Sequence, residues 1–453
     1  MILKRESMDM TTGSIWRHLI AFALPLVIGQ LFQRLYSTVD SVVVGRFVSS
    51  QALAAIGSTG NIIEALICLF SGMATGAGVV ISQYYGAKDY QGVRETVHTA
   101  VLVTCIMGVL CMVLGMLFAD TALRLMDTPD DVFADAAAYL RIYFGGVLGL
   151  MLYNIGSGIL QAVGDSRRPL YFLIFSAVTN VVLDLLFVLQ FHMGVEGVAY
   201  ATIISEFLSA ILTFIVLARS TECYRVSLRQ LRIYRRPLRP VLRIGVPAGL
   251  QQGIVAFSNV FVQAYINAFQ SACMAGWASY NRLDSFAWVP MICIGMASTT
   301  FTGQNIGAGN IRRTKDGVRI ALLLSVISTV AVIIPLMLFA KQALSLFNTD
   351  PEVLEYGRTF VLCCSPFYVP YCFFLICSGA VRGAGDSIRP MIISIFSFVV
   401  FRQCYLFIGT KFIHSPVFVG LSYPAGWVVS AILMYALYKS GKWERELSKN
   451  IAV

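Results

Sequence analysis

The chain is a succession of long apolar stretches separated by short polar turns, and this pattern strongly limits the folds open to it. Each stretch has about 20 residues, enough for a helix to cross a hydrocarbon core of ~30 Å. With 57% hydrophobic residues, 13% charged residues and a mean hydropathy of +0.74, the composition is far from that of a soluble globular protein. The sequence predicts an all-α integral membrane protein.

Twelve membrane-spanning helices account for the apolar stretches. The predicted spans cover residues 15–44, 52–82, 93–118, 134–157, 169–191, 195–218, 241–268, 276–302, 317–339, 355–378, 390–410 and 416–438. We therefore expect a multi-pass protein whose first partner is the lipid bilayer.

The formal net charge of +10 has the distribution of a membrane protein. When the N-terminus is placed in the cytoplasm, 25 of the 34 Lys and Arg residues fall on the cytoplasmic side, as the positive-inside rule requires. This placement predicts a cell (inner) membrane protein with both termini in the cytoplasm. It also argues against a nucleic-acid partner, because the basic residues follow the membrane topology.

The two halves of the chain resemble each other. The turn 164–169 (Gly-Asp-Ser-Arg-Arg-Pro) recurs at an offset of 221 residues as 385–390, and Pro25 recurs at an offset of 222 as Pro247. Six spans in each copy give both copies the same orientation. We expect two six-helix lobes, at 1–218 and 241–453, related by a pseudo-two-fold axis along the membrane normal. The basic stretch 219–240 is the expected cytoplasmic linker between them.

Several local motifs are read as structural. Asp and Arg in the repeated Gly-Asp-Ser turns are expected to brace those turns. Gly72, Gly76 and Gly78 are expected to pack closely against another helix. Ten of the eleven cysteines lie in apolar segments without a metal-type CxxC spacing, and no phosphate-binding or dinucleotide-binding glycine motif occurs. We therefore expect no cofactor, no metal centre and no direct use of ATP.

The paired GDSxRP turns, together with QYYGAK at 83–88 and QNIGAG at 304–309 after the second and eighth spans, give the chain a family likeness. It resembles the multidrug and toxic compound extrusion (MATE) family over essentially its whole length, and within that family the DinF-like branch. The resemblance implies secondary active export of organic, often cationic compounds, driven by an inward flow of protons or sodium ions. It also implies a cation-coupling site in the first lobe, formed by Asp40, Asn180, Asp184 and Thr202.

The residues themselves point to the same cluster. A carboxylate inside a membrane helix is costly and usually lines a cavity or has a partner. Asn180 and Asp184 are four residues apart and share a helix face, as do Tyr36 and Asp40. Such oxygen-rich groups suit a hard cation such as Na⁺, and a buried carboxylate suits a proton, so the coupling ion stays open between H⁺ and Na⁺.

The duplication provides an internal control for this cluster. By the repeat offsets, Asp40, Asn180, Asp184 and Thr202 correspond to residues without carboxyl or amide groups, which are Val262, Phe401, Tyr405 and Tyr423. Acids that merely packed the repeat would be expected in both copies, so the asymmetry favours a functional site.

Further polar residues within the predicted spans need partners or water, and we take them as candidates for substrate binding or coupling. They are Tyr36, Glu64, Glu206, Arg282 and Asp284. Arg282 and Asp284 are two residues apart and do not face each other on a helix. For Glu64, Glu206, Arg282 and Asp284, function and structural pairing stay open.

We therefore expect a secondary active antiporter that exports small organic, often cationic and amphipathic compounds in exchange for H⁺ or Na⁺. We expect it to act as a monomer. One alternative is a flippase for a lipid-linked precursor, which should show a strongly basic cleft, whereas few arginines, among them Arg34, Arg282 and Arg402, lie within spans. Another is a non-transporting membrane protein or a membrane enzyme. The four histidines lie near span ends or in loops, without metal spacing, so no enzyme is expected.

Overall fold

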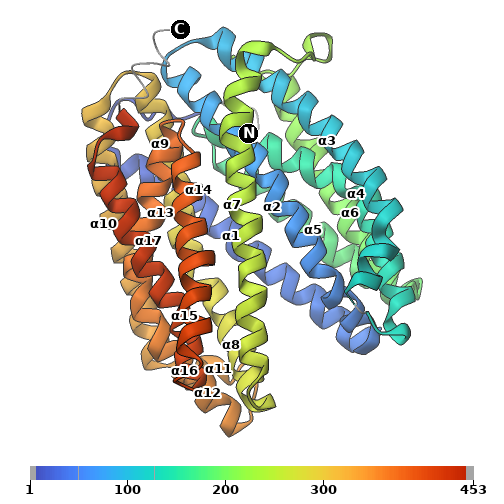
Figure 1. Cartoon of the computed structure of the whole chain (residues 1–453). Helices are drawn as coiled ribbons and strands as arrows, with labels where there is room; N and C mark the ends of the chain where they lie inside the picture. The colour runs from blue at the N-terminus through green and yellow to red at the C-terminus, as the bar shows by residue number, and fades with distance from the viewer. Residues whose placement is uncertain (1–6, 49, 127, 445–453) are drawn as a thin grey trace. The chain divides into compact units, whose positions relative to one another are not determined.

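The computed structural model describes residues 7–48, 50–126 and 128–444 of the 453-residue chain, and its regular secondary structure there is helical, with no strand (Figure 1). The first half of the chain forms α1 (Ile15–Phe47), α2 (Ser50–Gly86), α3 (Tyr90–Leu125), α4 (Asp130–Ala162), α5 (Arg167–Leu185), the π-helical turn η1 (Leu186–Gln190) and α6 (Gly194–Arg219). The linker that follows contains the short 3-10 turn η2 (Leu228–Gln230).

The second half repeats this plan with more interruptions. It forms α7 (Arg235–Asn267), α8 (Ser271–Ala287), α9 (Val289–Gly307), α10 (Ile311–Leu338), α11 (Ala340–Leu344), α12 (Pro351–Cys364), the 3-10 turn η3 (Ser365–Phe367), α13 (Tyr368–Gly383), α14 (Ile388–Ile395), the π-helical turn η4 (Phe396–Phe401), α15 (Arg402–Gly409), α16 (Pro416–Gly420) and α17 (Ser422–Lys439).

Each predicted span falls on one helix or on consecutive helices. Ten helical segments of the described residues are long and apolar enough to cross a membrane. The two other predicted spans, 52–82 and 241–268, lie in α2 and α7, which have 37 and 33 residues. α7 contains several glutamine and asparagine residues, and these lower its hydropathy.

The chain forms two compact units, and the division between them passes through α1 and α7. The first unit comprises Met1–Asp9 and Pro25–Gly249, and the second comprises Met10–Leu24 and Leu250–Val453. α1 therefore changes unit at Pro25, and α7 does so shortly after Pro247. A proline inside a helix removes one backbone hydrogen bond, so both crossings lie where the helix is weakened. The lobe limits expected from the sequence stay a prediction.

The segment before α1 forms hydrogen bonds with the QNIGAG turn of the second unit. The backbone N–H of Met10 donates to Oε1 of Gln304 (3.0 Å), and Asn305 Nδ2 donates to the Met10 carbonyl oxygen (3.2 Å). Arg313 donates to the carbonyl oxygens of Met10 (3.2 Å) and Thr12 (2.8 Å). Met10 is completely buried. The QNIGAG turn thus has a structural role in holding the segment before α1.

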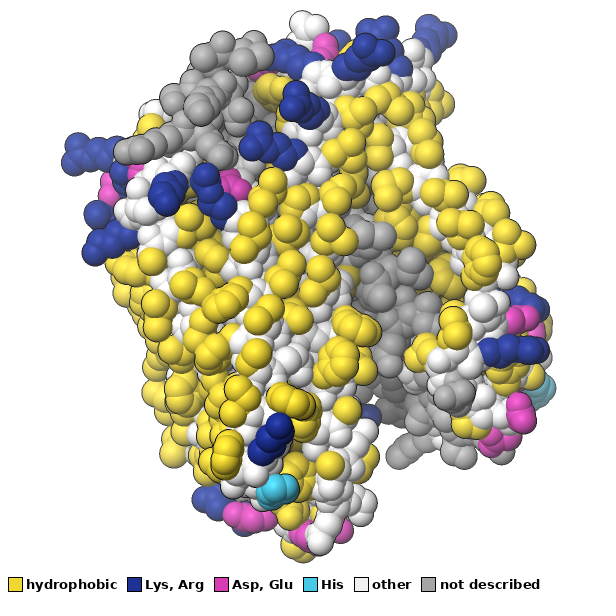
Figure 2. Space-filling view, viewed as in Figure 1, with side chains coloured by type: hydrophobic (Ala, Val, Ile, Leu, Met, Phe, Trp, Pro, Cys, Tyr) yellow, Lys and Arg dark blue, Asp and Glu magenta, His cyan; other side chains and the backbone are white. Residues whose placement is uncertain are grey.

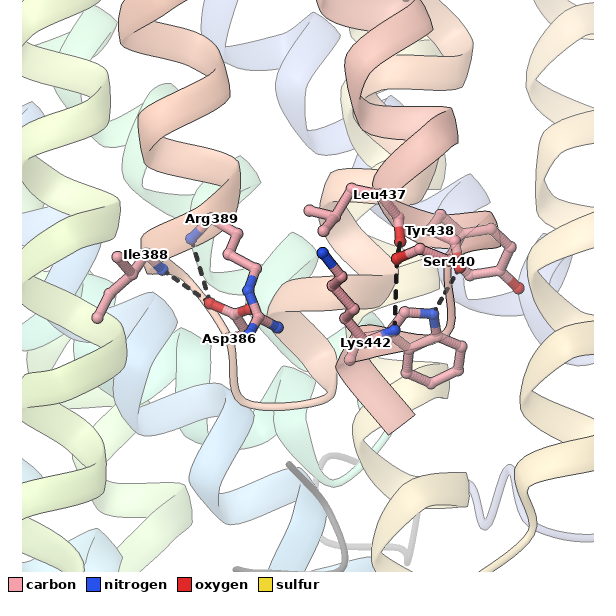
Figure 3. A network of polar contacts seen from close by, with 8 residues as sticks. Asp386, Ile388, Arg389, Leu437, Tyr438, Ser440 and Lys442 are labelled. Carbon is pink, nitrogen blue, oxygen red and sulfur yellow. Dashed lines mark hydrogen bonds and ion pairs between the residues drawn. The ribbon is translucent and has the colours of Figure 1, made fainter. Parts of the chain in front are cut away.

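The two Gly-Asp-Ser turns brace the starts of α5 and α14, as predicted. Asp386 Oδ1 accepts hydrogen bonds from the backbone N–H groups of Ile388 (3.1 Å) and Arg389 (3.2 Å), and Oδ2 lies 3.0 Å from the Arg389 guanidinium (Figure 3). Asp165 makes the same contacts with Arg167 and Arg168. These carboxylates occupy the unpaired N–H groups of a helix start.

Glycines allow α2 and the beginning of α7 to touch within the first unit. A Cβ atom on Gly72 would lie 2.2 Å from the backbone nitrogen of Gly249, and one on Gly76 would lie 2.5 Å from the carbonyl oxygen of Val241. A Cβ on Gly78 would meet its nearest atom at 3.7 Å, on Gly158. The predicted close packing is confirmed for Gly72 and Gly76, whereas Gly78 is in ordinary contact.

Aromatic rings fill the core of the second unit. Trp277 packs edge-on against Phe360 with ring centroids 4.9 Å apart, and Trp288 lies 4.7 Å from Tyr371. Trp427 contacts several of the same rings. On the outside, hydrophobic side chains cover the length of α14, α15 and α17 (Figure 2). An apolar core with an equally apolar surface is typical of a helical unit surrounded by lipid.

Candidate functional site

The first unit holds a pair of membrane carboxyl groups, on Asp40 of α1 and Asp184 of α5. Asp184 is completely buried and Asn180, one turn earlier, is 1% exposed. The two carboxyl groups interact directly with each other. Neither oxygen of Asp184 nor Oδ1 of Asp40 has a hydrogen-bond donor in the described part of the chain. Two facing carboxylates repel each other, so this arrangement favours a proton or a cation between them.

The side-chain amide of Asn180 belongs to the same unsatisfied group. Its nitrogen and its oxygen are both buried without a hydrogen-bond partner among the described residues. Buried polar atoms are normally paired, and an exception calls for an explanation. Asn180, Asp40 and Asp184 together offer oxygen atoms that nothing in the described fold uses.

Two tyrosines and a glutamate complete the cluster. Tyr139 of α4 interacts electrostatically with Asp40, Asp184 and Glu206, and Tyr36 interacts with Asp40 and Glu206. Glu206 of α6 therefore lies near the Asp40 cluster, and its role in coupling stays a prediction. Tyr139 was not predicted. Its only signal is the spacing to Tyr143, with which its ring stacks at 6.3 Å.

The hydroxyl group of Thr202 donates a hydrogen bond within its own helix. Its Oγ1 donates to the carbonyl oxygen of Val198 at 3.0 Å. A hydroxyl that donates in this way keeps its oxygen lone pairs for accepting hydrogen bonds or binding a cation. The geometry is therefore compatible with the predicted role, and that role stays a prediction. The side chain of Glu64 lies outside the described residues.

The structure separates Arg282 from Asp284. Arg282 is exposed, whereas Asp284 Oδ1 accepts hydrogen bonds from Trp288 Nε1 (2.9 Å) and from the Tyr368 hydroxyl. Tyr368 itself lies 3.3 Å from the hydroxyl of Tyr280. Asp284 is thus hydrogen-bonded within the aromatic core of the second unit, and the choice between a functional and a structural role stays open for this residue. Its partner Tyr368 was not foreseen, because it is distant in sequence.

The second unit has packing residues at the positions that correspond to the acid cluster. Val262 is completely buried in the hydrophobic core, and the Tyr405 hydroxyl donates to the carbonyl oxygen of Phe418 (3.4 Å). Phe401 ends the π-helical turn η4. The asymmetry seen in the sequence is therefore also present in the folded units.

Comparison with known proteins agrees with this duplicated plan. The MatE family model matches the chain twice, over residues 25–186 and 247–407. The chain belongs to the MatE family. The match to both halves confirms the family expected from the sequence. The two matched segments begin at Pro25 and Pro247, which correspond to each other in the repeat.

Relatives of this MatE chain cover nearly all of it. It is 30% identical over 434 residues to the "Probable multidrug resistance protein YoeA" of Bacillus subtilis, covering 94% of each chain. It is 23% identical over 395 residues to the "FAD transporter" of Shewanella oneidensis, covering 86% of this chain and 87% of the relative.

A solved structure supports the fold of this MatE chain. The crystal structure described as "MATE in the bent conformation" matches with a TM-score of 0.91 at 24% identity, covering 99% of this chain and 100% of the other. The predicted fold class, an all-α membrane protein of twelve helices in two lobes, is confirmed by this likeness. The chain is a multi-pass membrane protein.

Proposed function

We infer that the protein is a cation-coupled antiporter that exports organic compounds across the membrane. The observation that carries this inference is the pair Asp40 and Asp184 in one unit of a duplicated MatE fold, three of whose carboxyl oxygens have no donor among the described residues. The relative YoeA, which spans nearly the whole chain, is described as a probable multidrug resistance protein. Small organic compounds are therefore the proposed substrates, and no catalytic reaction is assigned to the chain.

The proposed coupling uses Asp40 and Asp184 as the ion-binding pair. When a proton or a sodium ion binds between the two carboxyl groups, their mutual repulsion is relieved. The conformation that binds the ion more tightly is stabilised relative to the other conformation. A difference of a few kcal/mol in ion-binding free energy between the two is enough to shift the equilibrium between them. Binding of the ion would thereby favour release of the exported compound.

The same residues could serve either coupling ion. Na⁺ needs several oxygen ligands, and Asp40, Asn180, Asp184 and Thr202 each offer one or more. A proton needs only the carboxyl groups, with Tyr139 and Tyr36 as neighbours. The proposal therefore assigns the site and leaves the ion to experiment. We further propose the cell (inner) membrane as location, cytoplasmic termini, a monomeric protein, and no cofactor beyond the coupling ion.

Transport in proteoliposomes tests this proposal. The wild-type protein and the variants Asp40→Asn and Asp184→Asn would be reconstituted, and efflux of a cationic dye would be followed under a proton gradient or a sodium gradient alone. We expect gradient-driven transport to fall at least tenfold in both variants, because each removes one ionisable group of the pair. The gradient that drives the wild-type protein identifies the ion.

A matched control comes from Asp131, which is exposed in the first turn of α4. Asp131→Asn removes the same charge at an exposed helix start, two turns before Tyr139, and we expect full transport. Unchanged transport in both cluster variants would refute the coupling site.

A further inference from the structure

The second unit contains a buried cation that has no anionic partner among the residues described by the structure. Arg402 begins α15 directly after η4, inside a membrane span, and is 2% exposed. One of its terminal nitrogens donates to Ser258 Oγ and to Asn259 Oδ1, each at 2.8 Å. Its Nε has no hydrogen-bond partner in the described residues. The Tyr423 ring lies 4.7 Å from the guanidinium carbon.

All of these partners are neutral, and this is unusual for a guanidinium inside a membrane. Arginine stays protonated in proteins, so Arg402 cannot avoid the cost of burial by losing its charge. Buried charges in membrane spans normally pair with an opposite charge or line a path for an ion or a substrate. No acidic side chain of the described residues forms an ion pair with Arg402. The Nε of Arg402 has no acceptor among the described residues, so one donor of the guanidinium is left for an anion.

The partner Asn259 connects Arg402 to an exposed stripe on α7. Gln252, Asn259, Gln263 and Asn267 follow one another at intervals of seven, four and four residues, which places them on one face of the helix. Three of these amides are exposed and that of Gln263 is half-buried. Phe257 and Phe261, on another face, are 65% and 48% exposed. α7 thus has an apolar face suited to contact with lipid and a separate amide-bearing face suited to contact with water and polar solutes.

The location within the repeat gives this cation a functional context. By the repeat offsets, α7 corresponds to α1, and the stretch that ends in Phe401 and Arg402 corresponds to the part of α5 that carries Asn180. In the first unit this pair of helices carries Asp40 and Asp184. In the second unit the same pair carries Arg402. Arg402 itself corresponds to Val181, so the two units carry side chains of opposite charge on equivalent helices but at different positions.

We propose that Arg402, positioned by Ser258 and assisted by the side-chain amide of Asn259, binds a carboxylate or another oxyanion of the exported compound. Ser258 itself does not donate to the anion, because its hydroxyl donates to the carbonyl oxygen of Phe398 (2.7 Å). This inference rests on the proposed function and specifies the chemistry of its substrates. It adds amphipathic zwitterions and organic anions to the simple organic cations that the transporter is proposed to export. Nε and the terminal nitrogens of a guanidinium match the two oxygens of a carboxylate. The guanidinium carbon lies over the Tyr423 ring, which packs against it.

A pair of dyes that differ in one group can test the assignment. Rhodamine B carries a carboxylate that is ionised at neutral pH, and rhodamine B ethyl ester has the same ring system with that charge removed. Binding of both dyes to the purified full-length protein in detergent would be measured by fluorescence polarisation. We expect the wild-type protein to bind the carboxylate dye more tightly, and Arg402→Gln to weaken its binding about tenfold or more. Binding of the ester should change by no more than about twofold.

Asn259 provides a second variant in case the loss of Arg402 disturbs folding. Asn259→Asp places a carboxylate beside the guanidinium, so the internal ion pair should abolish the preference for rhodamine B. Asn267→Asp is the matched control, because it adds the same charge to the same stripe two turns away, and it should keep the preference. Retained binding of the ester shows that each variant is folded.

The outcomes separate this inference from the proposed function. Equal affinity of the wild-type protein for the two dyes, or equal losses for both dyes in Arg402→Gln, would overturn the oxyanion site while leaving cation export intact. A preference that survives in Asn259→Asp would overturn it as well. If the wild-type protein binds neither dye, both the oxyanion site and the proposed export of organic compounds are contradicted.

Discussion

The contact between α2 and the beginning of α7 allows a quantitative prediction for Gly72→Ala. The new Cβ atom would lie 2.2 Å from the Gly249 nitrogen and 2.4 Å from its Cα, whereas real Cβ atoms essentially never approach within 3.0 Å. The backbones must therefore separate by at least 0.8 Å, the difference between 3.0 and 2.2 Å. Because both atoms in conflict belong to the backbone, no side chain can rotate to relieve the contact.

The expected cost follows from this lack of relief. Overpacking of a well-packed interior typically costs about 1–3 kcal/mol, and we expect Gly72→Ala near the upper end. Since about 1 kcal/mol shifts the Tm of a domain of 150–250 residues by roughly 2–4 °C, the Tm should fall by roughly 5–10 °C. Thermal unfolding of the purified protein, followed by the loss of monodisperse material after heating, would measure this shift.

Gly78 provides the matched control in the same helix. A Cβ there meets its nearest atom at 3.7 Å, which is ordinary van der Waals contact, so Gly78→Ala should change the Tm by no more than about 2 °C. Alanine also favours the helix over glycine by about 1 kcal/mol, which works in the same direction in both variants. Equal Tm values for the two variants would show that the close approach of α2 and α7 does not exist as described.

Two further predictions concern the turns. Asp165→Ala should destabilise the protein more than Asp386→Ala, because the guanidinium left behind is 5% exposed in Arg168 and 33% exposed in Arg389. Loss of one partner from a buried ion pair costs about 3–5 kcal/mol, and a reversed order in chemical denaturation would contradict the assignment. Gln304→Leu removes the acceptor of the Met10 N–H hydrogen bond. Amide hydrogen exchange at Met10, measured by mass spectrometry on the peptide that contains it, should therefore become at least tenfold faster. Unchanged exchange in that peptide would show that the contact is not formed.

The long helices could be predicted because an apolar stretch in a membrane has no alternative to helix formation. Their interruptions could not. The predicted span 276–302 is two helices that meet at Trp288 just before Pro290, and span 355–378 is broken by η3 at Pro366. A proline in a membrane helix predicts a weakened position, but tertiary packing decides whether the helix bends, breaks or continues, as α1 continues through Pro25.

Helical spacing predicted the part of the candidate site that lies on a single helix. An interval of four residues correctly placed Asn180 and Asp184 on one face. It could not find Tyr139, because that contact joins different helices and has no local signature. The same limit applies to Asp284, whose partner Tyr368 is 84 residues away. Contacts within one helix follow from geometry alone, whereas contacts between helices depend on how the whole unit packs.

The exchange of helix beginnings between the two units has a consequence for biosynthesis. Residues 10–24 are made early but belong to the same unit as residues 250–453, and the partners of Met10 at Gln304, Asn305 and Arg313 are made hundreds of residues later. Proteins generally fold in the order of synthesis, domain by domain. Here the N-terminal half cannot be completed as a self-contained domain, and a chain cut at the linker would yield two halves that each carry a segment belonging to the other. The start of the chain therefore reaches its final place only after the second half has been synthesised.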